Sequence, residues 1–277
     1  MAVYTKSAGE GAAVSNYSLP IQAAGDIDND GKATFSRPWD GTFPSGSQTV
    51  YGYYPYKASA GSDLNAVALE VPASQVMHEG SYDRTSDFMF GVPATYNVND
   101  GSAVNIENFR FSYVVGFLNF SFKDIVPETE AAEKLTAADK VESVKLEATD
   151  PMGNPMLSGA FTLDLETGIP AYGANDFTKN VIELEVSENM TLGTLNAWFV
   201  THPFELANEG KITLTVTTEN HIITKEVMVA DITGGGNFEL MVGGIKTFNI
   251  SFDANCTIED VQSGTEYPFS VLYDPYG

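Results

Sequence analysis

Hydrophobic and polar residues alternate with a period of two along most of the chain, which is typical of β-strands with one buried face. Ile212, Leu214 and Val216 alternate with lysine and threonine, and after the turn TENH the pattern resumes through Ile223 and Val227. These two runs predict a β-hairpin. The same period recurs in residues 144–148, 161–165, 182–186 and 248–252. Turn sequences such as NDG, PSG, ETG and GGG separate the runs, so the pattern predicts antiparallel sheets in a sandwich or barrel.

Residues 109–125, FRFSYVVGFLNFSFKDI, are apolar on both faces of the predicted strand. Phe109, Phe111 and Tyr113 occupy odd positions, whereas the apolar residues from Leu118 onwards occupy even ones, and the change falls at Gly116. Because glycine tolerates the backbone geometry of a β-bulge, we expect a central strand that is bulged at Gly116.

The segment PETEAAEKLTAADK, residues 127–140, carries the helical pattern of the chain. It is rich in Ala, Glu and Lys and is opened by Pro127, and these residues favour the body and the first position of a helix. We expect a helix here and place a domain boundary in it. The resulting fold prediction is all-β, with two antiparallel β-sandwich domains in tandem, residues 1–130 and 138–277.

The cluster YGYYPYKAS places four tyrosines close together: Tyr51, Tyr53, Tyr54 and Tyr56. A tyrosine ring is apolar on its face and polar at its tip, so exposed tyrosines could form a platform for a sugar or a protein. Tyrosine also favours strands, and Pro55 favours extended backbone before it. The alternative is therefore a strand with Tyr51 and Tyr53 packed inward and the other two rings at its rim.

The stretch DIDNDGKATF, residues 26–35, has the opening spacing of a calcium loop. Asp26, Asp28, Asp30 and Gly31 agree with the EF-hand rule, but the twelfth position is Arg37 where the ion requires a bidentate carboxylate. We therefore interpret the stretch as an acidic turn with calcium affinity no better than about 10⁻³ M. No metal site is predicted.

Composition and charge limit the partners. The chain has 277 residues with 37 acidic and 14 basic side chains, a net charge of −23, which repels nucleic acid and anionic lipid surfaces. Cys256 is the single cysteine, so no intramolecular disulfide can form. No apolar run reaches the roughly 20 residues that span a bilayer. The first residues lack a secretory signal, so the chain is either cytosolic or lacks its targeting segment.

Catalytic motifs are not evident in the sequence. His78, His202 and His221 are the available histidines, and none lies in a glycine-flanked serine motif or an HExxH helix. Pairs of carboxylates suited to glycoside hydrolysis cannot be selected among 37 acidic residues, because the sequence does not give their separations. We predict no catalytic residue and no cofactor.

Several segments together resemble a known family. YGYYPY, SDFMFG, the aromatic strand of residues 109–122, VESVKLEATD, LSGAFTLDLETG, LNAWFVTHPF, KITLTVTTE and GGIKTFNISF occur in an order similar to the fimbrillin and fimbrillin-like proteins of Bacteroidales, which build type V pili. The resemblance implies transthyretin-like sandwich domains, export as a lipoprotein and a place at the outer membrane surface. It also implies no enzymatic activity and, as partners, other pilus subunits and a host protein or glycan.

The same resemblance implies assembly by strand exchange, in which an extended segment of one subunit fills a groove of the next. The C-terminal sequence GTEYPFSVLYDPYG is the candidate donor, because Phe269, Val271 and Tyr273 alternate with Ser270, Leu272 and Asp274 and a chain terminus is free to leave its own fold. The alternative is an ordinary last strand of its own domain. Two further functions stay open: a surface glycan-binding lipoprotein that uses the tyrosine cluster, and a carboxylate-dependent glycan hydrolase.

Overall fold

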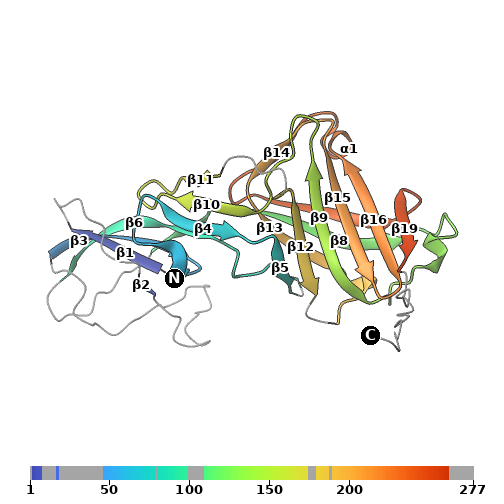
Figure 1. Ribbon diagram of the computed structural model, residues 1–277, viewed down its shortest axis with the longest axis horizontal. Coiled ribbons are helices and arrows are strands. Elements are labelled where there is room, and N and C mark those ends of the chain that lie inside the picture. Colours follow the sequence, from blue (N-terminus) through green and yellow to red (C-terminus); the bar gives the residue numbers. More distant parts are fainter. Residues whose placement is uncertain are drawn as a thin grey trace, which may run out of the picture.

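The computed structural model describes residues 2–7, 17–18, 46–78, 80–98, 109–173, 179–186 and 189–261. It confirms an all-β fold, with strands that form five sheets. The molecule is elongated, and a smaller lobe that holds the N-terminus adjoins a larger lobe built mainly from the second half of the chain (Figure 1). Within the described ranges, no helix is long and apolar enough to cross a membrane.

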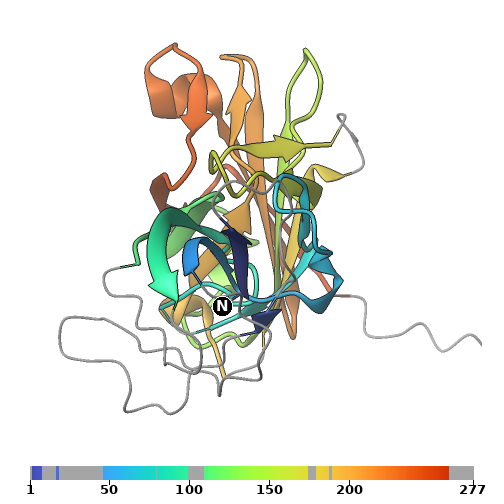
Figure 2. The same cartoon turned by 90° about the vertical axis from the view of Figure 1, so that its left-hand side faces the viewer.

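The smaller lobe, here the N-terminal lobe, contains two sheets. Five strands pair in the order β2 (Tyr17–Ser18), β1 (Ala2–Ser7), β3 (Gly46–Tyr54), β6 (Met89–Val98) and β7 (Phe111–Tyr113). Three more pair in the order β11 (Pro170–Tyr172), β10 (Gly159–Leu163) and β4 (Val67–Val71). Figure 2 looks at this lobe along the long axis of the molecule. Its core takes apolar side chains from both sheets, including Tyr53, Leu69 and Phe161.

The larger, C-terminal lobe is a sandwich of two main sheets. The six-stranded sheet has the order β19 (Cys256–Asp260), β16 (His221–Met228), β15 (Lys211–Thr218), β9 (Val141–Thr149), β12 (Val181–Val186) and β5 (Ser74–Met77). The second main sheet, which we call the three-stranded sheet from here on, has the order β13 (Asn196–Thr201), β8 (Gly116–Ile125) and β18 (Ile245–Phe252). A short pair, β14 (Phe204–Leu206) and β17 (Phe238–Leu240), lies beside them. In Figure 1 the long strands β9, β15 and β16 run across β8, as in crossed packing of two sheets.

The core of this lobe is formed by the apolar residues that alternate with polar ones along its strands. Val144, Leu146 and Ala148 of β9 are buried, and so are Ile212 and Leu214 of β15, while the residues between them lie on the outer face. Removal of these apolar surfaces from water is the main force that joins the two sheets. The hairpin predicted from the sequence is confirmed, because β15 and β16 pair antiparallel from Lys211 opposite Met228 to Thr217 opposite Ile222.

Strand pairing does not follow chain order around the boundary predicted near residues 130–138. β4 pairs with β10, and β5 pairs in parallel with β12. Phe161 and Leu163, from the predicted second domain, lie in the core of the N-terminal lobe. The division into two tandem sandwich domains is therefore not confirmed.

The prediction of one bulged strand through Gly116 is wrong. The chain forms β7 up to Tyr113 and begins β8 at Gly116, and the two strands belong to different sheets. Gly116 is required by packing, because a Cβ atom there would lie 2.7 Å from Cδ2 of Leu240. The register shift of β8 lies further along, opposite Ile250 and Ser251.

The helix predicted over residues 127–140 is also wrong. The segment contains only a 3₁₀ turn, η2 (Ala132–Lys134). Asp139 accepts hydrogen bonds from the backbone N–H and the hydroxyl of Thr136, both at 2.8 Å, and such local bonds compete with helix formation. The other helical turns in the described ranges are η1 (Ala58–Ala60), η4 (Leu192–Thr194) and a short α-helix, α1 (Val229–Thr233).

Candidate assembly groove

Strand β18 is an edge strand of the three-stranded sheet. It pairs in parallel with β8, and among the described residues no strand lies on its other side. The backbone N–H of Phe117 donates to the carbonyl oxygen of Gly244 at 2.9 Å. Because the hydrogen-bonding direction alternates along a strand, the backbone groups of Thr247 and Asn249 point away from β8. They offer donors and acceptors to an additional strand.

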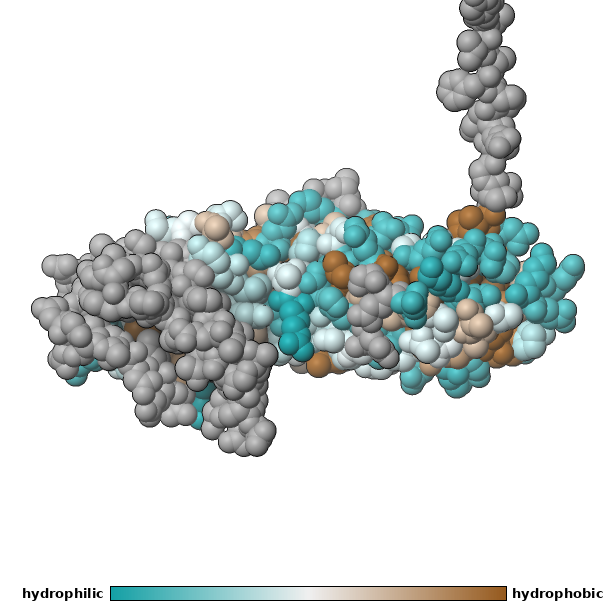
Figure 3. Space-filling view, turned by 90° about the horizontal axis from the view of Figure 1, so that it is seen from below, coloured by the Kyte–Doolittle hydropathy of each residue, from teal (hydrophilic) through white to brown (hydrophobic). Residues whose placement is uncertain are grey.

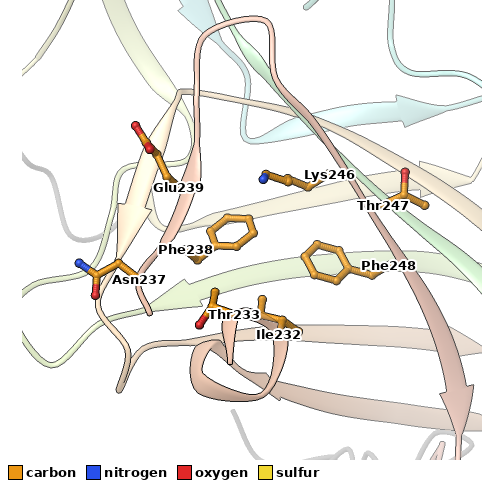
Figure 4. A pocket seen from close by; sticks show the side chains of 8 residues that line it. All are labelled: Ile232, Thr233, Asn237, Phe238, Glu239, Lys246, Thr247 and Phe248. Atoms are coloured by element: carbon orange, nitrogen blue, oxygen red, sulfur yellow. The ribbon is translucent and has the colours of Figure 1, made fainter. Parts of the chain in front are cut away.

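A hollow of about 360 Å³ with both polar and apolar lining residues lies beside this edge, and we name it the assembly groove. Its lining comes from α1, from β17 with the residue before it, and from β18: Ile232, Thr233, Asn237, Phe238, Glu239, Lys246, Thr247 and Phe248. Figure 4 shows the rings of Phe238 and Phe248 facing the same space, with Ile232 and Thr233 on the helix beneath them. The two ring centroids are 6.2 Å apart.

The groove is anchored in the core of the C-terminal lobe. Phe248 stacks on the buried ring of Phe120, with centroids 5.0 Å apart and planes at 16°. Lys246 places its Nζ atom 6.0 Å from the centroid of Phe238, within the range of a cation–π contact. Both rings are therefore packed against the core of the C-terminal lobe.

Glycines close the short helix that forms one wall. Val229 at its start is buried, and Gly234 at its end adopts φ 70°, a left-handed conformation that ends a helix. The hydroxyl of Thr233 donates to the carbonyl oxygens of Val229 and Gly236, at 2.9 and 2.6 Å. The GGG sequence is thus the end of a helix and the turn into β17, which agrees with its interpretation as a turn.

A second hollow of about 520 Å³ is lined by residues of β14, of β17 and of the loop that follows β17, among them Phe204, Leu240, Met241 and Val242. Met241 is 63% exposed and Val242 49% exposed, so the loop between β17 and β18 presents apolar side chains to solvent. By contrast, the face shown in Figure 3 is mainly hydrophilic, with hydrophobic side chains only in small groups. Contiguous exposed apolar surface marks interaction sites.

The opposite edge of the same sheet is closed. The side chain of Gln75, on β5, donates from Nε2 to the carbonyl oxygen of Val200 at 2.7 Å and accepts from the Val200 N–H at 3.0 Å. Gln75 is only 1% exposed. It therefore takes the place of a neighbouring strand on β13, which leaves β18 as the open edge of this sheet.

The tyrosine cluster does not form an exposed platform. Tyr51 is 7% exposed and Tyr53 is fully buried, and the hydroxyl of Tyr53 donates to the carbonyl oxygen of Lys57 at 3.0 Å. Tyr54 and Tyr56 are half-buried. Two rings therefore pack inward and two lie at the rim of the strand, as in the alternative interpretation of the sequence.

His202, His221 and Cys256, which the sequence analysis considered as candidate reactive groups, lie in buried or partly buried positions. Burial lowers the pKa of His202 to about 4, and its Nε2 lies 3.1 Å from the carbonyl oxygen of Gly159. His221 places Nε2 3.7 Å from a carboxylate oxygen of Asp260. Burial raises the pKa of the Cys256 thiol. Within the described ranges, no three His, Cys, Asp or Glu side chains gather in a metal-binding arrangement.

Two sequence-predicted sites lie outside the described residues. They are the acidic stretch of residues 26–37 and the candidate donor strand with Phe269, Val271 and Tyr273. The sequence analysis did not identify the assembly groove. The feature of the sequence that could have indicated the groove is Phe248, which begins an alternating run soon after two glycines, Gly243 and Gly244.

Comparison with known proteins relates the fold to solved structures. No protein-family model and no curated protein sequence matches the chain. A crystal structure of a putative cell adhesion protein from Bacteroides uniformis matches at 17% identity, over 94% of this chain and 89% of that one, with a TM-score of 0.54. A putative cell adhesion protein from Bacteroides ovatus matches at 18% identity, over 83% of this chain and 73% of that one, with a TM-score of 0.45.

A fimbrial protein from Bacteroides ovatus also matches, at 12% identity, over 91% of this chain and 44% of that one, with a TM-score of 0.34. These three solved structures are Bacteroides proteins assigned to cell adhesion or to fimbriae. At these identities the likeness concerns the fold, and the chain shares that fold with the Bacteroides uniformis protein.

Proposed function

We propose that this protein is a non-enzymatic subunit of a surface fimbria or an adhesin, and that it assembles by strand exchange in the assembly groove. In this proposal an extended segment of a neighbouring subunit adds to the open edge of β18. Its backbone bonds to the groups of Thr247 and Asn249, and its apolar side chains contact Phe238 and Phe248. The open edge beside a groove that contains the rings of Phe238 and Phe248 is the observation that carries the proposal.

The physical basis is strand addition to a sheet edge. Backbone hydrogen bonds give such complexes their affinity, and pockets for alternate side chains give specificity and register. The C-terminal segment with Phe269, Val271 and Tyr273 is the proposed donor, because its alternating apolar residues suit a groove that is lined on one side by aromatic rings. The names of the fimbrial and adhesion proteins with a similar fold support a place at the cell surface.

The donor is tested by removal of residues 266–277. We expect the truncated protein to keep a melting temperature close to that of the full chain and to form no polymers, as measured by light scattering and electron microscopy. If the segment is instead a structural strand, its loss exposes the apolar surface it covered and costs several kcal/mol. A large drop in melting temperature on truncation would contradict the donor assignment.

The acceptor is tested by Thr247→Pro in the full chain. Proline removes a backbone N–H that points away from β8, so the sheet keeps its internal bonds while an added strand loses one. We expect polymerisation to be lost or slowed at least about tenfold. The matched control is Thr247→Val, which keeps the N–H and the β-branched shape and should polymerise normally. Equal polymerisation of both variants would exclude β18 as the acceptor.

A further inference from the structure

The sheet of β13, β8 and β18 has an outer face with an unusual set of side chains, which the proposed function does not explain. The strand register places three pairs of side chains on this face, away from the core. From β8, β13 and β18 in turn, they are Asn119 and Ser121, Asn196 and Trp198, and Thr247 and Asn249. We call this set the amide face. It combines three amides, two hydroxyls and one indole ring.

None of these six side chains carries a charge, although the chain as a whole has a net charge of −23. The outer face of the six-stranded sheet differs, because charged side chains are mixed there with threonines such as Thr215 and Thr224. The charged residues are Lys145, Glu147, Glu183, Glu185, Lys211 and Glu226. The amide face is polar without charge.

Hydrogen bonds hold part of the amide face in a fixed arrangement. Asn119, which is buried, donates from Nδ2 to Oδ1 of Asn196 at 2.5 Å. The hydroxyl of Ser121 lies 3.1 Å from Oδ1 of Asn119 and 3.2 Å from Oδ1 of Asn196. Thr247 and Asn249 are exposed, and their side chains make no hydrogen bond to any described residue. The face thus offers unused donors and acceptors next to ordered ones.

Aromatic side chains border the amide face where the two lobes meet. Tyr82 packs against Trp198 with ring centroids 6.2 Å apart and against Phe117 at 4.7 Å. The hydroxyls of Tyr82 and Tyr113 are 2.9 Å apart. Both Tyr82 and Trp198 are half-buried, so parts of their rings remain accessible. The turn before Tyr82 contacts the polar side, since a Cβ at Gly80 would lie 4.0 Å from Nδ2 of Asn196.

We propose that the amide face binds a neutral glycan. Amide and hydroxyl side chains can both donate and accept, so they match the hydroxyl groups of a sugar, which do the same. The half-buried rings of Tyr82 and Trp198 offer apolar surface to the C–H face of a pyranose. None of the six side chains of the amide face is a cation that could pair with an anionic glycan, and the net charge of the protein repels such a ligand.

The test uses the full chain and affinity electrophoresis in gels that contain one soluble polysaccharide each. Neutral mannan, galactan and β-glucan are compared with anionic polygalacturonate. We expect at least one neutral polysaccharide to retard the protein, and polygalacturonate to leave its mobility unchanged. Retardation by polygalacturonate alone, or by none of the four, would overturn the proposal.

The site is located with the double variant Ser121→Ala/Asn249→Ala, whose two residues face each other across β8 and β18. The matched control is Thr215→Ala/Thr224→Ala, a cross-strand pair on the outer face of the six-stranded sheet. We expect about tenfold weaker glycan binding for the first variant and unchanged binding for the control. Equal binding by both would overturn the assignment to the amide face. If Ser121→Ala impairs folding, Asn249→Ala alone repeats the test, because Asn249 is exposed.

Discussion

The two edges of the three-stranded sheet differ in how their backbone groups are satisfied. On β13 the buried amide of Gln75 bonds both polar groups of Val200. On β18 no described strand or side chain occupies the equivalent place, and the assembly groove lies beside it. Edge strands invite pairing with other chains, and proteins usually cover or charge them. The closed edge therefore serves the stability of the fold, whereas the open edge is available for association.

The substitution Gln75→Leu removes the hydrogen bonds that close the β13 edge, and we expect it to have the largest effect on the free energy of unfolding. Leucine has a similar size but leaves the N–H and the carbonyl of Val200 buried without partners. Each such group costs about 1–3 kcal/mol, so we expect a loss of about 4 kcal/mol in the free energy of unfolding. Chemical denaturation measures this loss.

The control for Gln75→Leu is Ser74→Ala. Ser74 is the adjacent residue, is exposed, and donates to a carboxylate oxygen of Glu185 at 3.0 Å. We expect this variant to change stability by less than about 0.5 kcal/mol. A similar loss in both variants would show that β5 as a whole, and not the amide of Gln75, maintains the edge.

The segment that follows β5 contains a buried carboxyl group, Asp87, whose ionisation makes the stability of the fold depend on pH. Asp83 accepts a hydrogen bond from the N–H of Val76 at 3.3 Å, next to Gln75. Close by, burial raises the pKa of Asp87 to about 7; the neighbouring Asp83 also raises it and Arg84 lowers it. Asp87 Oδ1 and the hydroxyl of Ser86 are buried without a hydrogen-bond partner among the described residues. The carboxylate form of Asp87 is therefore the less favourable one.

A raised folded-state pKa means that folding stabilises the protonated form. The stability that Asp87 contributes is fully present below the unfolded pKa of about 3.9 and is lost as the pH rises through about 7. We expect Asp87→Asn, which stays neutral, to gain about 2 kcal/mol relative to the wild type between pH 4 and pH 8. Unfolding curves at both pH values measure this gain, and parallel pH profiles of the two proteins would contradict it.

The substitution Ile245→Lys places a positive charge on the open edge, β18, and we expect it to cause the smallest change in stability. Ile245 is 57% exposed at the first position of β18, so its replacement should alter the free energy of unfolding by less than about 0.5 kcal/mol. A lysine on an edge strand opposes edge-to-edge pairing. Sedimentation at rising protein concentration should show weaker self-association than in the wild type. Unchanged self-association would show that subunits meet elsewhere.

Features of the fold that depend on residues close together in the chain could be predicted from the sequence. The alternation at Ile212, Leu214 and Val216 was enough to place a hairpin and its buried face, since side-chain direction in a strand has a period of two. The inward rings of Tyr51 and Tyr53 follow from the same rule.

Features that depend on distant residues could not be predicted. Gln75 and Val200 are 125 positions apart, and nothing near either one indicates their contact. The parallel pairing of β8 with β18 likewise joins residues more than a hundred positions apart. The parity change at Gly116 was read correctly as a break in the pattern, but the sequence does not distinguish a bulge from the end of one strand and the start of another in a different sheet.

The pairing of β4 with β10 also determines the order of events during synthesis. Val67, Leu69 and Val71 lie on a strand whose described partner, residues 159–163, is made about ninety residues later. The core around them also takes Leu165 and Val200. The first half of a nascent chain therefore cannot complete its own lobe, and its apolar strands stay uncovered until most of the protein has been made. A protein with this connectivity depends on protection of its early segments until the later ones arrive.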